Sequence, residues 1–281
     1  MANYICTTCG VQFTPTPAPP DHCPICEDER QYVNWHGQTG TTLGDLRAEH
    51  HNVIKQAEPG LIGIGTQPSF AIGQRALLVQ APSGNILWDC TSLIDEATIE
   101  AVQALGGLSA VAMSHPHFYA SMVEWSHAFG GVPIYVHAAD RAWVMRPDPA
   151  ITFWEGDTHT LGEGIRLLHC GGHFDGATIL HWAAGADGHG VLLTSDIIHV
   201  VGDRRYVSFM YSFPNLIPLA AADVHRIVQT LEPLTYERIY GAWFEQVVHT
   251  DARAAVIRST TRYLSAIAGN DCSRQPLATV R

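Results

Sequence analysis

Histidine and aspartate residues stand where three apolar runs of the chain end, and these residue types could bind a metal ion. His115 and His117 follow LSAVAM, His173 follows GIRLLHCGG, and Asp196 follows GVLLTS. Short apolar runs bounded by turn residues are typical of buried strands, so we expect these side chains at one end of a sheet layer. Three imidazoles and a carboxylate suit Zn²⁺ or Fe²⁺. The sequence therefore predicts a metal centre, in which Asp196 could also act catalytically.

A second candidate metal site lies near the N-terminus. Two cysteine pairs, Cys6-x-x-Cys9 and Cys23-x-x-Cys26, flank a proline-rich stretch. Each turn directs two thiolates at one tetrahedral centre, which suits zinc and also iron. So short a segment cannot bury enough apolar surface to fold alone, so a bound metal would supply its folding free energy. A structural zinc site is the favoured interpretation, and an electron-carrying site is the alternative.

Composition limits the class of protein. The chain has 281 residues, 46% of them hydrophobic, which suffices for a large domain with a buried core and a small second unit. A formal charge of -11 disfavours nucleic acid as a partner. With no apolar run of membrane-spanning length and no signal-like start, we expect a cytoplasmic protein that does not bind membranes. Cys90, Cys170 and Cys272 lack metal-site spacing and are expected to be ordinary thiols.

The elements that must position these residues follow from periodicity. Residues 41–60 predict a short helix that Thr42 can cap. Beyond residue 60, short β-rich runs such as NILWDC, VPIYVH, TILHW and ERIYGAWF alternate with helical patterns, including 121–129, a helix from Ala138, and 251–268. Clustered strands with helices between them predict two packed β-sheets covered by helices.

Two family resemblances rest on these motifs. The N-terminal unit, down to its second knuckle CPIC, resembles the rubredoxin-like zinc ribbon found at the end of rubrerythrins, over residues 1–36. The motifs SHPHFY, CGGHFDGATILHW and LLTSDII, in that order, resemble the metallo-β-lactamase superfamily. That resemblance implies an α+β fold, a four-layer αββα sandwich with the metal site at its edge. We therefore predict the four-cysteine unit at 1–36, a linker helix at 37–60 and a metallo-β-lactamase-fold domain at 61–281.

The resemblance to metallo-β-lactamases also implies which ions are held. The first metal of the family would take His115, His117 and His173, with Asp196 as the bridging carboxylate. The ligands private to the second metal are all replaced, by Tyr119, Ala120 and Ala242. Because the first set is complete while the second is empty, we expect a mononuclear centre.

A single Zn²⁺ can still polarise a carbonyl and acidify water, so the leading hypothesis is a metal-dependent hydrolase acting on a small molecule. Its general base would be Asp196, Asp175 or Glu124. Each of the last two also has a structural interpretation, Glu124 as a carboxylate in the first turn of a helix and Asp175 as a turn residue. Tyr119 could donate a hydrogen bond to substrate or fill the vacated volume. His127 and His249 are expected to be ordinary histidines.

Two alternatives stay open. One is a mononuclear iron redox enzyme, dioxygenase-like, linked to the four-cysteine unit, so that either site would hold iron. The other is a non-catalytic metal-binding protein. The aromatic insert at 203–219 is expected to form a pocket wall beside the metal or to pack in a core or interface, and its exposed aromatic residues would suit a homodimer.

Overall fold

Two β-sheets form the centre of the computed structural model, which describes residues 1–269; Cys272 lies outside the described residues. The first sheet has the order β3-β4-β5-β6-β7-β8-β9 and the second β10-β11-β12-β13-β18-β19. The first contains β3 (His51–Glu58), β4 (Leu61–Gln67), β5 (Ala76–Val79), β6 (Ile86–Trp88), β7 (Ala110–Ala112), β8 (Ile134–His137) and β9 (Ile151–Trp154). The second contains β10 (Thr158–Gly162), β11 (Ile165–His169), β12 (Thr178–Trp182), β13 (Val191–Ser195), β18 (Arg238–Gly241) and β19 (Val247–Val248).

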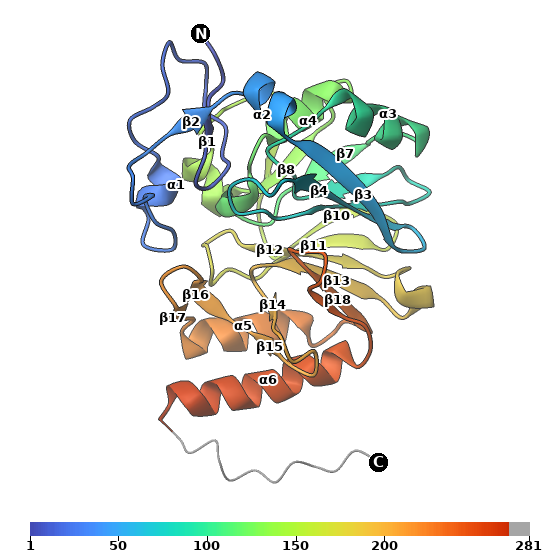
Figure 1. Ribbon diagram of the computed structural model, residues 1–281. Helices are drawn as coiled ribbons and strands as arrows, with labels where there is room; N and C mark the ends of the chain where they lie inside the picture. The colour runs from blue at the N-terminus through green and yellow to red at the C-terminus, as the bar shows by residue number, and fades with distance from the viewer. Residues whose placement is uncertain (270–281) are drawn as a thin grey trace.

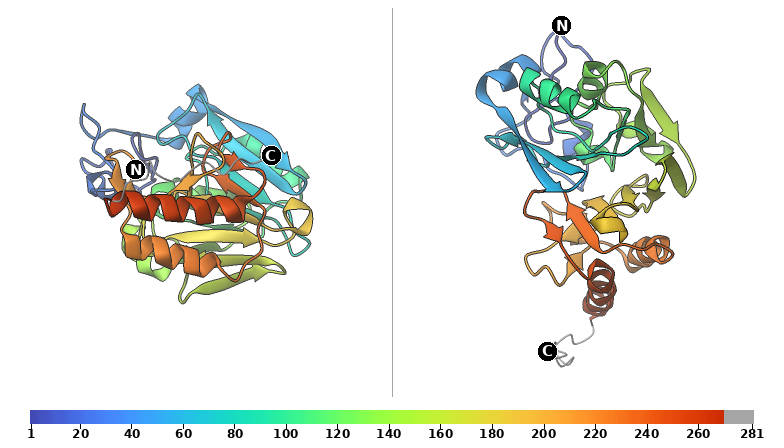
Figure 2. Two further views of the ribbon diagram at one scale, coloured as in Figure 1. Left: turned by 90° about the horizontal axis from the view of Figure 1, so that it is seen from below. Right: turned by 90° about the vertical axis from the view of Figure 1, so that its right-hand side faces the viewer.

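Helices cover the outer face of each sheet. Figure 1 shows α3 (Glu96–Ala104) and α4 (Met122–Ala128) above the first sheet, and α5 (Ala221–Leu231) and α6 (Ala252–Ile267) below the second. Seen from below, α5 and α6 lie side by side (Figure 2). The arrangement confirms the predicted four-layer αββα sandwich.

Three apolar clusters fill the spaces between the four layers. The central one combines Leu77 and Trp88 of the first sheet with Leu180 and Leu193 of the second. The two outer clusters lie between each sheet and its helices. Strands buried on both faces explain the nearly continuous apolar runs of the sequence, because neither face of such a strand meets water. Among residues 1–269, no helix combines the length and apolar character needed to cross a membrane.

The four-cysteine unit packs on the first half of the sandwich. It contains β1 (Ile5–Cys6) and α1 (Pro24–Glu27), and β1 pairs antiparallel with β2 (Gly40–Thr41), which follows the unit. Its cysteines, with Val11 and Ile25, belong to the same buried cluster as the first sheet and α4. The unit is therefore part of the main apolar core rather than an appended module.

The linker-helix prediction for 37–60 is wrong over its second half. Helix α2 covers only Leu43–Glu49, and Thr42 caps it as predicted by accepting the N–H of Asp45 at 3.2 Å. The following residues form β3, whose Val53 and Ile54 pair with β4 at Gly65 and Ile64. Pairing with a neighbouring strand outweighs the helical spacing of these β-branched residues.

Two smaller differences concern short elements. The helix expected from Ala138 is a 3₁₀ helix over Ala138–Trp143, named η2. Most of the aromatic insert lies in or between three two- or three-residue strands, β15 (Val207–Ser208), β16 (Met210–Ser212) and β17 (Ile217–Pro218), while β14 (His199–Val200) precedes it. Strands this short leave no period to detect, which explains the irregular pattern of the insert.

Candidate metal centres

The histidine centre, formed by His115, His117, His173 and Asp196, lies at the predicted strand ends. The two histidines of the first half follow β7, and His117 lies in the 3₁₀ helix η1 (Pro116–Phe118). His173 lies in the loop between β11 and β12, and Asp196 directly follows β13. All four are buried, with one donor atom of each within 4.8 Å of the others. The structure therefore brings together every predicted ligand of the inner site.

Donor separations in this centre fit one small cation. Nε2 of His173 lies 3.3 Å from Nδ1 of His117, and Nε2 of His115 lies 3.6 Å from Oδ2 of Asp196. A tetrahedral zinc ion with bonds of about 2.0–2.1 Å places its donors about 3.3 Å apart. Nε2 of His115 is buried and has no hydrogen-bond partner among residues 1–269. A bound cation would satisfy that atom, which is otherwise costly to bury.

Neighbouring polar groups orient the imidazoles. Nδ1 of His115 lies 2.8 Å from the Ser114 hydroxyl, and Nδ1–H of His173 donates to the Met210 carbonyl at 3.0 Å. Each contact turns Nε2 toward the centre, as such contacts do for histidines that bind metal.

Asp89 joins the two segments that carry His115 and Asp196. Its Oδ1 accepts the N–H of Ser114 at 2.8 Å, and its Oδ2 accepts the hydroxyl of Ser195. Burial raises the pKa of Asp89 to about 7. Our sequence analysis missed this residue, although an aspartate directly after the strand NILW was a usable signal.

Comparison with known proteins identifies relatives of the whole chain. Over 269 residues it is 49% identical to YmaE of Bacillus subtilis (strain 168), described as an uncharacterized protein, and the match covers 95% of this chain and 97% of YmaE. The chain belongs to the YmaE family. No family model matches it.

Solved structures show the fold of this YmaE-family chain. The DIM-1 metallo-β-lactamase is 12% identical with a TM-score of 0.58, and the match covers 77% of this chain and 98% of DIM-1. The metallo-β-lactamase SMB-1 is 15% identical with a TM-score of 0.51, covering 79% and 96%. At these identities the likeness concerns the fold, which is that of the metallo-β-lactamases as the motifs predicted.

The positions expected for a second ion hold no replacement ligands in this YmaE-family member. Ala120 and Ala242 are buried and offer no donor side chain. Tyr119 is buried in the same apolar cluster as Val11, and burial raises its pKa well above the ordinary value. Within residues 1–269, groups of three or more metal-ligating residues occur twice, at the cysteines and at the histidine centre. Both predicted roles of Tyr119, donation of a hydrogen bond to substrate and filling of the vacated volume, stay predictions.

The other proposed general bases lie outside the donor group. Glu124 accepts hydrogen bonds from Arg146 at 2.5 Å and from Gln12 at 3.3 Å, which favours its structural interpretation. Asp175 is exposed, and its backbone carbonyl accepts a bond from His169 at 2.7 Å. Of the four candidate catalytic residues, only Asp196 shares the donor group. Catalytic roles for the other three stay predictions.

The two histidines expected to be ordinary, His127 and His249, lie outside the donor group. His127 pairs with Asp148 at 3.0 Å, and His249 is exposed.

His199 is a further residue near the centre that our sequence analysis missed. It lies in β14, three residues after Asp196. Burial raises the pKa of Asp196, and positive charge on His173 or His199 would oppose that shift. Its ring centroid lies 4.7 Å from that of Phe213, which in turn lies 5.7 Å from the ring of His173. The aromatic insert therefore does supply a wall beside the histidine centre. The sequence SDIIH, which places a histidine three residues after Asp196, could have indicated this residue.

Electrostatics keeps the imidazoles neutral. Burial, assisted by the charge of Arg30, lowers the pKa of His115 to about 3. Burial and the neighbouring His115 lower the pKa of His173 to about 4, and burial lowers that of His117 well below its ordinary value. Neutral imidazole is the form that binds metal, so the three rings are ready ligands at neutral pH.

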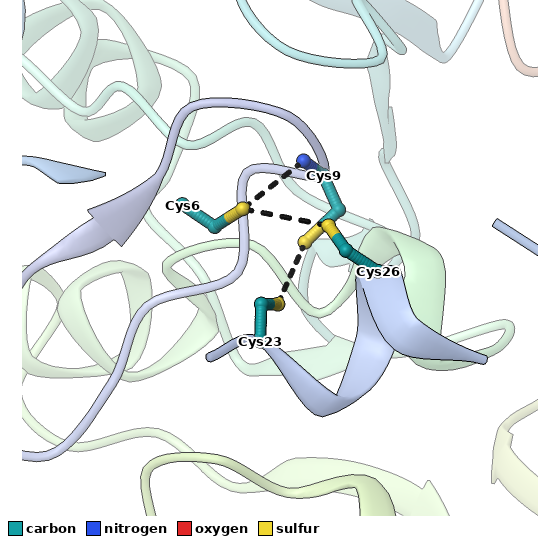
Figure 3. Close-up of side chains that lie close together, drawn as sticks. All are labelled: Cys6, Cys9, Cys23 and Cys26. Atoms are coloured by element: carbon teal, nitrogen blue, oxygen red, sulfur yellow. Dashed lines mark hydrogen bonds between the residues drawn. The ribbon is translucent and has the colours of Figure 1, made fainter. Parts of the chain in front are cut away.

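The four-cysteine site has the geometry of a single metal ion (Figure 3). Sγ of Cys6 lies 3.6 Å from that of Cys26, and Sγ of Cys9 lies 3.6 Å from that of Cys23. Zinc–sulfur bonds of about 2.3 Å in a tetrahedron place the sulfur atoms about 3.8 Å apart, whereas a disulfide requires about 2.05 Å. The side chain of Gln38 donates to Sγ of Cys6 at 3.2 Å, which suits a thiolate.

The cysteines outside this site behave as expected. Cys90 and Cys170 are buried free thiols, and burial raises the pKa of Cys170 to about 12. A buried neutral thiol is neither a nucleophile nor a metal ligand, so these residues are inert.

Proposed function

We propose that this protein is a mononuclear metal-dependent hydrolase acting on a small molecule at the histidine centre. One observation carries the proposal. A complete, buried donor set has the spacing required by one tetrahedral ion, while Tyr119, Ala120 and Ala242 stand at the sequence positions that the resemblance assigns to the ligands of a second ion. Zinc is the cation proposed for both sites, because imidazole, carboxylate and thiolate donors at these separations suit it.

Asp196 has a distinct role in this proposal. Catalytic zinc sites have three protein ligands and keep one position open. Oδ2 of Asp196 lies 3.6 and 4.0 Å from Nε2 of His115 and of His173, further than the 3.3 Å that separates His117 from His173. We therefore assign the three imidazoles as the ligands and Asp196 as the group that holds water in the open position.

The bound cation would supply Lewis acidity that polarises a carbonyl oxygen and lowers the pKa of water. Oδ1 of Asp196 is buried and has no hydrogen-bond partner among the described residues, so it is the atom able to accept the proton. Glu124 cannot compete for this role while it is paired with Arg146. General-base assistance of this kind is worth about 10²–10⁴-fold in rate.

The surroundings of the centre favour a small, partly apolar substrate. The four residues of the centre each expose 4% of their surface or less. The rings of Phe174 and Phe213 lie 5.4 and 5.7 Å from that of His173. A centre this enclosed, with aromatic rings beside it, favours a small ester, thioester or lactone over a polymer.

The same burial favours a second candidate function. Three histidines and a carboxylate also bind Fe²⁺, and a closed apolar site suits a small gaseous substrate such as dioxygen. A mononuclear iron redox enzyme is therefore the alternative, with the four-cysteine site as its electron carrier.

The test combines metal analysis with turnover. Protein purified without added metal is expected to contain two zinc ions per chain and to hydrolyse members of a panel of small esters, thioesters and lactones. Asp196→Asn is expected to keep the inner ion and to lose about 10²-fold or more in kcat, whereas Glu124→Gln keeps kcat. Iron at both sites, with a red colour from the cysteine site, would favour the redox function. Full turnover in Asp196→Asn would remove Asp196 as the base.

A further inference from the structure

The first knuckle of the four-cysteine unit, residues 6–12, contacts the segment that supplies His115 and His117. The backbone N–H of Gln12 donates to the carbonyl of Ala120 at 3.0 Å, three residues after His117. The carbonyl of Gly10 accepts the Ser92 hydroxyl at 2.8 Å. Ser121 in turn donates to the carbonyl of Ser92 at 2.8 Å. This knuckle is thus bonded to the loop that carries two of the three imidazoles.

The second knuckle, residues 23–31, contacts the segment that supplies the third imidazole. Nη1 of Arg30 donates to the carbonyl of His173 at 3.4 Å, and its guanidinium carbon lies 3.9 Å from the ring centroid of Phe174. Asp28 fixes the guanidinium through two bonds, from Nε at 2.6 Å and from Nη2 at 2.8 Å. Because Asp28 holds the planar guanidinium group in one orientation, its hydrogen bond to the carbonyl of His173 is also fixed.

The second knuckle also holds the strand that orients the His173 ring. The Ser212 hydroxyl donates to the carbonyl of Arg30 at 3.1 Å. The side chain of Asn215 donates to the carbonyls of Glu29 and Gln31 at 2.9 and 3.0 Å. Ser212 ends β16, which begins with Met210, the acceptor for Nδ1–H of His173. Figure 1 shows the loop after α1 running down toward β16 and β17. Both the backbone and the ring of His173 therefore depend on this knuckle.

The cysteine site brings the two knuckles together near these contacts. Cys6 and Cys9 come from the first knuckle, and Cys23 and Cys26 from the second. All four are free thiols, with paired sulfur atoms 3.6 Å apart, so no disulfide joins them, whereas one metal ion bound by all four would do so. Helix α1 carries Cys26 and ends at Glu27, directly before the segment that contains Arg30.

We propose that the metal at the four cysteines assembles the histidine centre, with Arg30 as the positioning residue that transmits its effect to His173. The ion joins a knuckle bonded to the His117 segment to a knuckle bonded to the His173 segment, which come from opposite halves of the sandwich. The proposal rests on metal binding at both sites and is independent of the reaction catalysed. By linkage, each ion raises the affinity for the other by the same factor.

The first test uses Co²⁺ loading of the full chain, with chelator competition. Thiolate-to-Co²⁺ charge-transfer absorption reports the cysteine site, and weaker visible bands report the histidine centre. Arg30→Ala is expected to lower the Co²⁺ affinity of the histidine centre about 10–100-fold, the usual effect of losing a group that orients a ligand. The cysteine site of Arg30→Ala should still fill with Co²⁺. Its affinity should fall at most by the factor by which one ion raises the affinity for the other. Arg30→Lys is expected to recover part of the loss.

Arg47→Ala is the matched control, because Nε of Arg47 also donates to a backbone carbonyl, that of Ile94 at 2.8 Å, outside these contacts. It is expected to change neither site. Equal inner-site affinity in Arg30→Ala and wild type would overturn the proposal.

The second test removes the outer ion. Cys23→Ser combined with Cys26→Ser is expected to abolish the charge-transfer band and to weaken the inner site at least as much as Arg30→Ala. Inner affinity that stays at the wild-type value in this variant would also overturn the proposal, and Arg30→Ala decides the matter if the double variant does not fold. A failure to find hydrolysis would count against the proposed reaction alone, since metal affinity is the quantity measured here.

Discussion

Nδ1 of His117 lies 3.3 Å from Nε2 of His173, although 56 residues separate them in the chain. Nδ1–H of His173 donates to Met210, so its Nε2 presents a lone pair in the neutral ring. Burial keeps both rings neutral by lowering their pKa values. This pair, with His115 and Asp196 beside it, forms the donor group of the proposed inner metal site.

Replacing His173 by alanine should empty the inner site alone. The variant loses one of three imidazole ligands, whereas the cysteine ligands are untouched. We expect metal analysis to find about two ions per chain in wild type and about one in His173→Ala, with thiolate charge transfer retained after Co²⁺ loading. His127→Ala, which removes a histidine paired with Asp148, should keep both ions. Two ions per chain in His173→Ala would remove this residue from the ligand set.

Asp89 should matter for stability. Asp89→Ala leaves the N–H of Ser114 and the hydroxyl of Ser195 buried without their acceptor. Each such loss costs about 1–3 kcal/mol in the free energy of unfolding, to be measured by urea denaturation. Asp89→Asn keeps one acceptor and tolerates the positive φ of 55° at this position, so it should recover part of the stability. Equal stability of wild type and Asp89→Ala would contradict this role.

Asp140 should make stability fall as pH rises. Burial raises its pKa to about 7, although Oδ1 accepts the N–H of Gly176 at 2.8 Å. An unfolded aspartate has a pKa of about 3.9, so the folded state binds more protons between these values. The contribution of protonated Asp140 to the free energy of unfolding is complete below about pH 4. It is lost, by about 1.4 kcal/mol per pH unit, as pH approaches 7.

The free energy of unfolding of Asp140→Asn, relative to that of wild type, should therefore increase as pH rises from about 4 to 7. It should still exceed that of wild type at pH 8. Urea denaturation at pH 5, 6, 7 and 8 measures the difference, and the exposed Asp21→Asn serves as control. A difference that does not change with pH would show that Asp140 titrates normally in the folded protein.

Glu58 should hold the two sheets together. It ends β3 of the first sheet and accepts bonds from Arg238 at 2.8 Å and Tyr240 at 2.6 Å, both in β18 of the second. Glu58→Ala leaves these donors without their buried acceptor and should lower the free energy of unfolding by about 2–4 kcal/mol. Glu49→Ala, at an exposed position of α2, should change it by less than about 0.5 kcal/mol. Similar losses in both variants would show that the contact between sheets contributes little.

Local pattern was sufficient where a segment's own residues decide its structure. The apolar runs before His115, His173 and Asp196 became buried strands, because alternation and turn residues act over a few positions. It failed at residues 51–58, where pairing with β4 produced a strand instead of a helix. It also missed Asp89, which bonds to Ser195 106 residues further along the chain, and His199, whose Nε2 lies 3.4 Å from Nε2 of Gln246 although 47 residues separate them.

The chain's own residues determined the identity of the metal donors and the loss of the second ion's ligands, since donor chemistry belongs to the side chain wherever it lies. Tertiary structure alone decided that Glu124 pairs with Arg146 and that Arg30 reaches the backbone of His173. These are contacts between segments distant in sequence, set by how the two sheets and the four-cysteine unit pack, and no spacing along the chain encodes them.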